Sequence, residues 1–266
     1  LENMEVYEQP EDKEAEKQAE EKPEVKEETF LFDKSYECPV CYQGFKAKTV
    51  RSGKLRSLGT DRDLRPLYDQ MEPLKYDVVI CPHCGYAALT RFFGGLTAGQ
   101  IKAIKENISA NFHPVEEEKE TYTYEEALYR YKLCLANTIV KHGKVSEKAY
   151  ICLKAGWLLR SMGENLDPAV EDYNKKIQEI KEQEKDFLKN ALDGLITARQ
   201  TESYPICGMD EVTLEYLIAV LAMEFEKYDI SSRLIYNILN TPTVNNRIKD
   251  KAREVKDELL QQMGKK

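Results

Sequence analysis

The sequence predicts an α+β protein that is mostly α. We expect a small zinc-ribbon-like β head, an all-α body of helical hairpins resembling tetratricopeptide repeats (TPR-like), and a disordered acidic segment in front. Residues 1–29 consist largely of Glu and Lys, residues 30–114 carry two C-x₂-C pairs among short β-branched runs, and residues 121–266 place apolar side chains at helical spacing. These three observations set the boundaries of the three expected parts.

The acidic segment, residues 1–29, has almost no apolar side chains. Such a segment cannot bury enough surface to offset the entropy lost on folding, so we expect it to be disordered. It also accounts for the formal net charge of −8, because acidic and basic residues balance in the rest of the chain. The head and body are therefore expected to carry little net charge together.

Two cysteine pairs organise the head, Cys38 with Cys41 and Cys81 with Cys84. Two thiolates at this spacing lie on one tight turn and reach the same ion, so two such turns complete a closed tetrahedral shell of four sulfurs. This donor set is typical of a structural Zn²⁺ site, and a single iron ion with the same ligands is the alternative. A redox dithiol is less favoured, because the two pairs match and each has Pro after its first cysteine.

Short strands are expected around each cysteine turn. Residues 35–50 alternate loosely about the first pair, and the β-branched run at residues 74–80 leads into the second. The segment between them, residues 61–73, has two prolines and mixed polarity, which predicts a loop with one turn of helix. Asp61, Asp63 and Asp69 in this loop are expected to be solvated side chains that cap turns, and paired acid chemistry is the less favoured alternative.

Capping signals mark the starts of the expected helices. T-x-x-Q at Thr97 and T-x-x-E at Thr123 are capping boxes. At Asp167, an N-cap residue is followed by Pro at the first helical position. Further helices are expected to begin at Ser146 and Asp210.

The order of helices and short loops after residue 121 indicates a helical-hairpin array. In the TPR template of about 34 residues, Tyr216, Tyr236 and Pro242 fall near the aromatic and proline positions. The match is partial, and an irregular helical bundle is the alternative.

Several motifs together resemble the bacterial domain-of-unknown-function 2225 family, over about residues 35–255. The motifs are C-P-V-C at Cys38, D-x-D at Asp61, E-P-L-x-Y-x-V at Glu72, C-P-H-C-G-Y-A-A at Cys81, L-K-A-G-W-L-L-R at Leu153 and E-Y-L-I at Glu215. The chain departs from the family's commoner C-P-x-C-G form at Tyr42, which stands in place of Gly after the first pair. The family brings no established activity, so the resemblance implies an architecture and little else.

The preferred function is a cytosolic protein-interaction module or adaptor that binds an unknown partner through its helical body. We do not expect an enzyme, because four thiolates leave no open position on the metal and the three histidines, His83, His113 and His142, are scattered. The chain has no apolar run of about 18 residues, so we expect no membrane span. Seven cysteines without an export signal fit a reducing cytosol.

A nucleic-acid-binding regulator is the alternative function. The run from Lys46 to Arg56 contains several cations and no acidic residue, and a zinc ribbon with basic strands can follow phosphates. The cations of this run are Lys46, Lys48, Arg51, Lys54 and Arg56. The acidic segment would compete for this surface, so nucleic acid is the less favoured partner.

Overall fold

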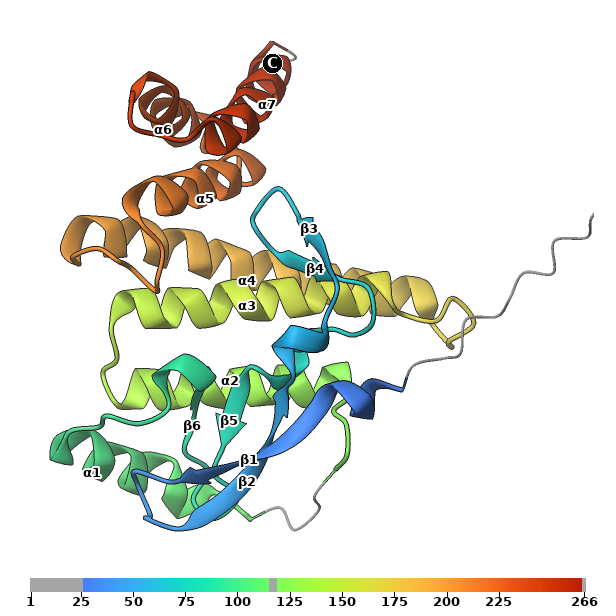
Figure 1. Cartoon of the computed structure of the whole chain (residues 1–266), viewed down its shortest axis with the longest axis vertical. Helices are drawn as coiled ribbons and strands as arrows, with labels where there is room; N and C mark the ends of the chain where they lie inside the picture. Colours follow the sequence, from blue (N-terminus) through green and yellow to red (C-terminus); the bar gives the residue numbers. More distant parts are fainter. Residues whose placement is uncertain (1–25, 115–118, 265–266) are drawn as a thin grey trace, which may run out of the picture.

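The computed structural model describes residues 26–114 and 119–264. These form a mostly helical protein with small antiparallel strand pairs near the N-terminus (Figure 1). The predicted α+β, mostly α class is confirmed. The disorder predicted for residues 1–25 falls outside the described residues.

The described chain begins with a short 3₁₀-helix, Glu27–Phe30, in a region that the sequence assigns largely to the acidic segment. The Glu27 carboxylate accepts hydrogen bonds from Lys75 Nζ at 2.7 Å and from the Tyr76 hydroxyl at 2.8 Å. Lys75 is only 9% exposed, so Glu27 neutralises a cation that has little access to water. Residues 27–29, which were expected to be disordered, are therefore ordered and make tertiary contacts.

The described strands form three two-stranded antiparallel hairpins. They are β1 (Leu31–Glu37) with β2 (Gly44–Val50), β3 (Ser57–Thr60) with β4 (Pro66–Tyr68), and β5 (Val78–Ile80) with β6 (Ala87–Leu89). The first and third hairpins carry the cysteine pairs in their turns, as predicted. The second falls partly within residues 61–73, where a loop was expected, and a 3₁₀-helix, Pro73–Tyr76, follows it.

Seven helices follow or flank these hairpins in the described residues. They are α1 (Ala98–Asn107), α2 (Tyr124–Val140), α3 (Val145–Glu164), α4 (Tyr173–Thr201), α5 (Glu211–Glu224), α6 (Tyr228–Asn240) and α7 (Asn246–Met263). The capping boxes predicted at Thr97 and Thr123 both form, and Asp210 caps α5. Local capping chemistry therefore located these helix starts correctly.

Two predicted helix starts are wrong. The helix expected at Asp167 begins at Tyr173, because the Asp167 carboxylate accepts a hydrogen bond from Ala169 N at 2.8 Å and closes a separate turn. Ser146 is not an N-cap but lies inside α3, where its amide and hydroxyl donate to the Glu202 carboxylate at 2.9 and 2.6 Å. In both cases the polar side chain serves a contact that the local pattern does not reveal.

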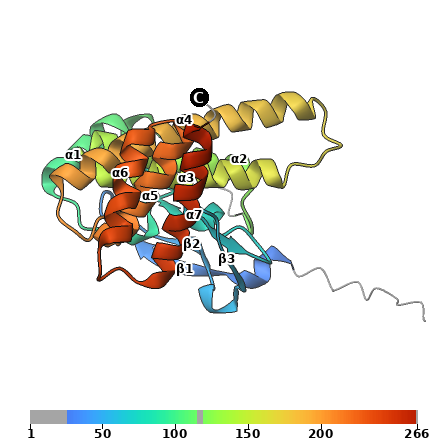
Figure 2. The ribbon, with the colours of Figure 1, turned by 90° about the horizontal axis from the view of Figure 1, so that it is seen from above.

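Helices α2, α3 and α4 lie side by side, and α5, α6 and α7 continue the array beyond α4 (Figures 1 and 2). Two glycines allow α3 and α4 to approach closely. A Cβ atom at Gly156 would lie 2.6 Å from Leu188 Cδ2, and one at Gly194 would lie 2.7 Å from Ala149 Cβ. The helical body is thus observed, while its TPR-like pairing stays a prediction.

The third hairpin, β5–β6, packs on α2 (Figure 1). Val78, Ala87 and Leu89 belong to the same hydrophobic core as the buried side chains of α2 to α7. Buried polar contacts reinforce this packing, since Tyr131 donates to Leu74 O at 3.0 Å and Asn137 donates to Gly85 O at 3.1 Å. Part of the predicted head therefore packs in the same core as the helices, and the division into head and body stays a prediction.

A second, smaller cluster surrounds the cysteines and includes Ile104 of α1. Among the described helices, none is both long enough and apolar enough to cross a membrane.

Candidate metal centre

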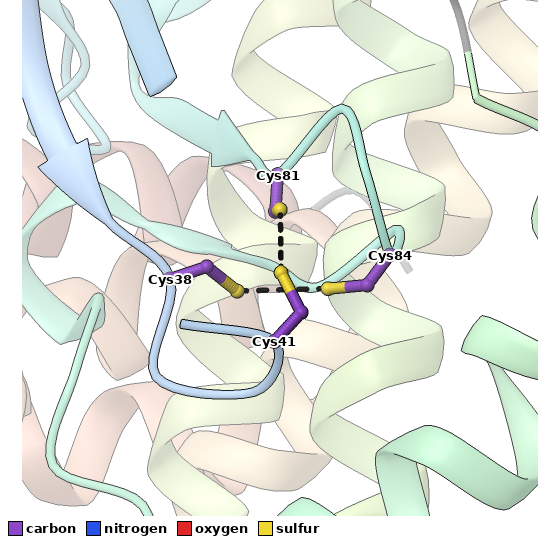
Figure 3. A group of neighbouring side chains, drawn as sticks. All are labelled: Cys38, Cys41, Cys81 and Cys84. Atoms are coloured by element: carbon purple, nitrogen blue, oxygen red, sulfur yellow. Dashed lines mark hydrogen bonds between the residues drawn. The ribbon is translucent and has the colours of Figure 1, made fainter. Parts of the chain in front are cut away.

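The structure brings the four predicted cysteines together at the turns of β1–β2 and β5–β6 (Figure 3). The Sγ atoms of Cys38 and Cys84 are 3.5 Å apart, those of Cys41 and Cys81 are 3.6 Å apart, and all four lie within 4.8 Å of one another. Sulfurs at about 2.3 Å from a tetrahedral Zn²⁺ are about 3.8 Å from each other. The four sulfurs can therefore hold one metal ion.

The two cysteine turns repeat the same backbone arrangement. Tyr42 N donates to Cys38 O at 2.8 Å in the first, and Gly85 N donates to Cys81 O at 3.0 Å in the second. The residue after each second cysteine is left-handed, with φ of 61° at Tyr42 and 73° at Gly85. Two equivalent turns facing each other supply two sulfurs each, as a tetrahedral shell requires.

Solvent exposure explains why the first turn tolerates a tyrosine at this left-handed position. Tyr42 is 65% exposed, so its side chain extends into solvent and the strain remains local. At Gly85, a Cβ atom would lie 2.5 Å from the Phe112 ring, so the second turn admits only glycine without rearrangement. Tyr42 therefore departs from the family pattern at the position where a side chain is better tolerated.

The sulfurs lie in an apolar environment. Cys38 and Cys81 are fully buried, and Val40, Tyr86, Ala88 and Ile104 complete the cluster around them. Cys84 is also buried and Cys41 is partly exposed, so most of the cluster is shielded from water, and this would protect metal–thiolate bonds.

The donor set by itself is not fully ionised. Hydrogen bonds from Cys81 and Cys84 lower the pKa of the Cys38 thiol to about 2. Hydrogen bonding to Cys38 raises the pKa of Cys81 to about 12 and that of Cys84 further. Four buried thiolates at this spacing repel one another, so full ionisation calls for a cation among them.

The other three cysteines lie outside this cluster. Burial raises the pKa of the Cys152 and Cys207 thiols to about 11, and Cys134 is fully buried in the main core. His83 is exposed and is not part of the sulfur cluster.

The basic run from Lys46 to Arg56 is spread over β2 and the turns that follow it. Lys48 Nζ lies 2.9 Å from an Asp33 oxygen, Arg51 Nε donates to Leu31 O at 3.1 Å, and Arg56 lies 3.8 Å from Asp69. Lys48 and Arg56 thus have carboxylate partners, which reduces the positive charge that this run offers to a phosphate backbone.

The expectation of solvated aspartates at the tip of β3–β4 is wrong for Asp63. This side chain is 3% exposed, accepts a hydrogen bond from Trp157 Nε1 at 2.9 Å and pairs with Arg160 at 2.9 Å. Beside it, the buried Arg65 pairs with Asp61 at 2.6 Å and with Glu164 at 2.8 Å. The signal in the sequence was the joint presence of D-x-D and the tryptophan–arginine motif of α3.

A cleft of about 720 Å³ lies beside the cysteine cluster; we call it the β2–α2 cleft. Residues 44–48 of β2 form one wall, and residues 122–130, at the start of α2, contribute to the other. Pro82 and His83 of the second cysteine turn also line it. No local pattern in the sequence indicates this cleft, because its walls come from segments far apart in the chain.

Comparison with known proteins yields a family. The model of a family described as an uncharacterized protein conserved in bacteria (DUF2225) matches residues 31–259. No curated protein and no solved structure matches the chain. The match runs from β1 into α7, so it covers the hairpins, the cysteine cluster and the helical array together.

Proposed function

This chain belongs to the DUF2225 family of uncharacterised bacterial proteins, as its motifs predicted, and we propose that it is a protein-interaction module shaped by a structural Zn²⁺ ion. The ion would be held by Cys38, Cys41, Cys81 and Cys84, and it would supply a fixed tetrahedral junction between two hairpins. The observation that carries the proposal is the closed set of four sulfurs at one end of the β2–α2 cleft.

A structural role follows from the number of ligands. Four cysteine sulfurs fill the tetrahedral shell of Zn²⁺ and leave no position for a substrate, so we propose no catalytic role for this centre. Most side chains of β1 are exposed, and the hairpin β1–β2 contributes few residues to the main core. The ion would therefore fix the position of this hairpin on the rest of the protein.

The cleft connects the centre to binding. One wall is β2, whose turn carries Cys38 and Cys41, and the other is α2, which belongs to the main core. Tyr129 of α2 is 56% exposed and lines the cleft. A partner could thus contact a surface whose width depends on the ion.

The helical array is a less favourable binding surface than the sequence suggested. The tip of β3–β4 lies against it and contacts α3, α5 and α7 (Figure 1). Tyr216 of α5 donates to Arg62 O at 3.0 Å, and Arg62 pairs with Glu258 of α7. Part of the surface that a TPR-like groove would offer is therefore covered by the chain itself.

We retain the TPR-like description for α5 and α6. These helices have 14 and 13 residues, which suits a repeat of about 34 residues. Helices α3 and α4, with 20 and 29 residues, are too long for it.

Site-specific photocrosslinking in cells tests the proposed binding surface. A photoreactive amino acid replaces Tyr129 in the cleft and, in a matched variant, Tyr236, which is exposed on α6. We expect crosslinks to a protein from position 129, and their loss in a Cys41→Ser background that no longer holds zinc.

Crosslinks from position 236 alone would move the binding surface to the helices. Crosslinks that disappear on nuclease treatment would favour the nucleic-acid alternative. A protein purified with neither zinc nor iron would overturn the structural role of the centre.

A further inference from the structure

The edge of β2 that faces away from β1 has no strand beside it in the described residues. Cys38 N donates to Gln43 O and Arg51 N donates to Phe30 O. Together with the strand register, these bonds show which residues of β2 direct their backbone groups towards β1. Because bonding alternates along a strand, the backbone groups of Gly44 point away from β1, as do those of Lys46 two residues later.

This free edge borders the cleft. Five consecutive residues of β2, 44–48, line it, although their side chains alternate between the two faces of the hairpin. Asp33 of β1 also lines the cleft, so the cleft extends from this edge over one face of the hairpin. No backbone hydrogen bond to Gly44 N or Lys46 N involves another described residue. The edge therefore offers donors and acceptors for an added strand.

The wall opposite β2 is suited to contacts with the side chains of a bound peptide rather than with its backbone. Tyr122, Phe112 and the exposed Tyr129 present aromatic rings to the cleft, and Ile80 and Pro82 add apolar surface. An extended chain on β2 would direct every second side chain towards these residues.

Arg130 gives this wall a positive charge that forms no ion pair with a carboxylate of the described residues, although the nearby Glu126 acts to raise its pKa. Its Nη2 donates to Val78 O at 3.2 Å and its guanidinium lies 4.2 Å from the centroid of the Tyr122 ring. Its Nε is buried with no hydrogen-bond partner, and no carboxylate of the described residues forms an ion pair with it. Burial lowers the pKa of Arg130, so an added carboxylate would be stabilising here.

We propose that the β2–α2 cleft binds an extended segment of a partner protein as a third strand on β2, with one carboxylate of that segment paired to Arg130. This inference rests on the proposed function and names the kind of partner. Strand addition supplies backbone hydrogen bonds, the aromatic wall supplies apolar contacts, and Arg130 selects the acidic side chain.

A peptide fits this cleft better than a nucleic-acid strand does. Asp33, Glu125 and Glu126 also line the cleft, and they would repel a continuous row of phosphates. A peptide can place one carboxylate at Arg130 and neutral side chains near these acids.

Peptide display on the intact, zinc-loaded protein tests the proposal. The probe is a library of random peptides of about nine residues, long enough to pair along one strand. We expect enriched sequences in which apolar residues alternate and one Asp or Glu keeps a fixed position. Binding of an enriched peptide is expected to slow amide exchange at Gly44 and Lys46.

Two pairs of variants locate the bound peptide. Lys46→Pro removes the N–H that points away from β1 and leaves the β1–β2 hydrogen bonds intact, so it is expected to weaken peptide binding by about tenfold or more. Lys46→Ala keeps this N–H and is expected to retain most of the affinity. Arg130→Gln is expected to abolish the preference for Asp or Glu, and Arg130→Lys to keep part of it. If Lys46→Pro unfolds the hairpin, peptides N-methylated at alternate residues test the same bonds on the unchanged protein.

Some results would overturn the strand addition. Enriched peptides that bind Lys46→Pro and Arg130→Gln unchanged would place the site elsewhere and leave the proposed interaction function standing. Failure to enrich any peptide, or displacement of enriched peptides by a peptide of residues 1–25 or by an oligonucleotide at equal concentration, would contradict the partner named here. Retention of zinc through all these experiments keeps this test separate from that of the metal centre.

Discussion

Two hairpins of this protein, β1–β2 and β3–β4, meet the rest of the chain through different chemistry. The tip of β1–β2 carries Cys38 and Cys41 and meets the other cysteine pair. The tip of β3–β4 carries Asp63 and Arg65, which are buried against α3 through Trp157 and other polar side chains. A two-stranded hairpin is at best marginally stable alone, so each needs an anchor outside its own strands.

The difference shows what each anchor requires of the rest of the chain. A metal centre needs only four correctly spaced thiolates, and its ligands come from two short turns. Buried ions need complete pairing, so the tip of β3–β4 depends on several residues of α3 that lie far away in the sequence. The first anchor can be read from local motifs and the second cannot.

Removal of the metal is expected to have the largest effect, and to separate the two hairpins. Chelation or Cys41→Ser should release β1–β2, because structural zinc peptides bind their ion with about 10–16 kcal/mol that also drives folding. Hydrogen exchange should quicken over residues 31–50, while β3–β4 and the helices keep their protection. The measurement is amide exchange by mass spectrometry, with zinc content determined on the same samples.

Cys152→Ser is the matched control, because Cys152 lies in the main core outside the sulfur cluster. This variant should keep its zinc. Loss of zinc from Cys152→Ser, or unfolding of the helices on chelation, would contradict the assignment of the metal as an anchor of β1–β2.

The second prediction breaks the other anchor. Asp63→Ala removes the buried carboxylate that pairs with Arg160 and accepts a hydrogen bond from Trp157 Nε1, so we expect a loss of about 3–5 kcal/mol, or a melting temperature lower by about 10 °C. Zinc content should not change. Asp69→Ala is the control, since Asp69 and Arg56 form an exposed pair at 3.8 Å that is worth at most about 1 kcal/mol. Equal losses in both variants would show that burial is not the cause.

Much of the fold was predictable because its signals are local. The cysteine pairs, the capping boxes and the apolar spacing of the helices each lie within a few residues of one another. The four cysteines were identified for the same reason. The boundary at residues 114–121 was a weaker inference, because Val78 and Leu89 pack with helices whose positions no local pattern specifies.

The features that escaped prediction depend on contacts between distant segments. Asp63 pairs with residues of α3, Glu27 with Lys75, and Ser146 with Glu202. The contact of Glu27 also bears on truncation, since removal of residues 1–29 would leave Lys75 unpaired whereas removal of residues 1–25 keeps the pair.

The third prediction compares the two cysteine turns. Gly85→Ala forces a Cβ atom to within 2.5 Å of the Phe112 ring at a left-handed position, so we expect a loss of about 1–3 kcal/mol. Tyr42→Gly relieves strain at the equivalent position and should raise stability by about 0.5 kcal/mol. Chemical denaturation of the zinc-loaded proteins measures both. Opposite signs are expected, and a loss in both variants would mean that the Tyr42 side chain has a stabilising contact.

The smallest expected effect concerns Glu72, at the base of β3–β4. Its carboxylate accepts a hydrogen bond from Leu74 N at 3.0 Å, and burial raises its pKa above the usual value for glutamate. A raised pKa in the folded state means that the folded protein binds the proton more tightly than the unfolded chain does. The stabilisation from protonated Glu72 is therefore complete below the pKa of the unfolded state, and it is lost as the pH rises through the pKa of the folded state. At neutral pH the ionised Glu72 therefore lowers stability, in contrast to Asp63, whose charge is paired.

Glu72→Gln keeps the acceptor and removes the charge, so it should stabilise the protein by on the order of 0.5 kcal/mol at neutral pH and by nothing measurable below about pH 4. Melting temperatures of both proteins between these pH values check the sign, and a destabilised Glu72→Gln at neutral pH would show that the carboxylate is needed by Arg65 nearby.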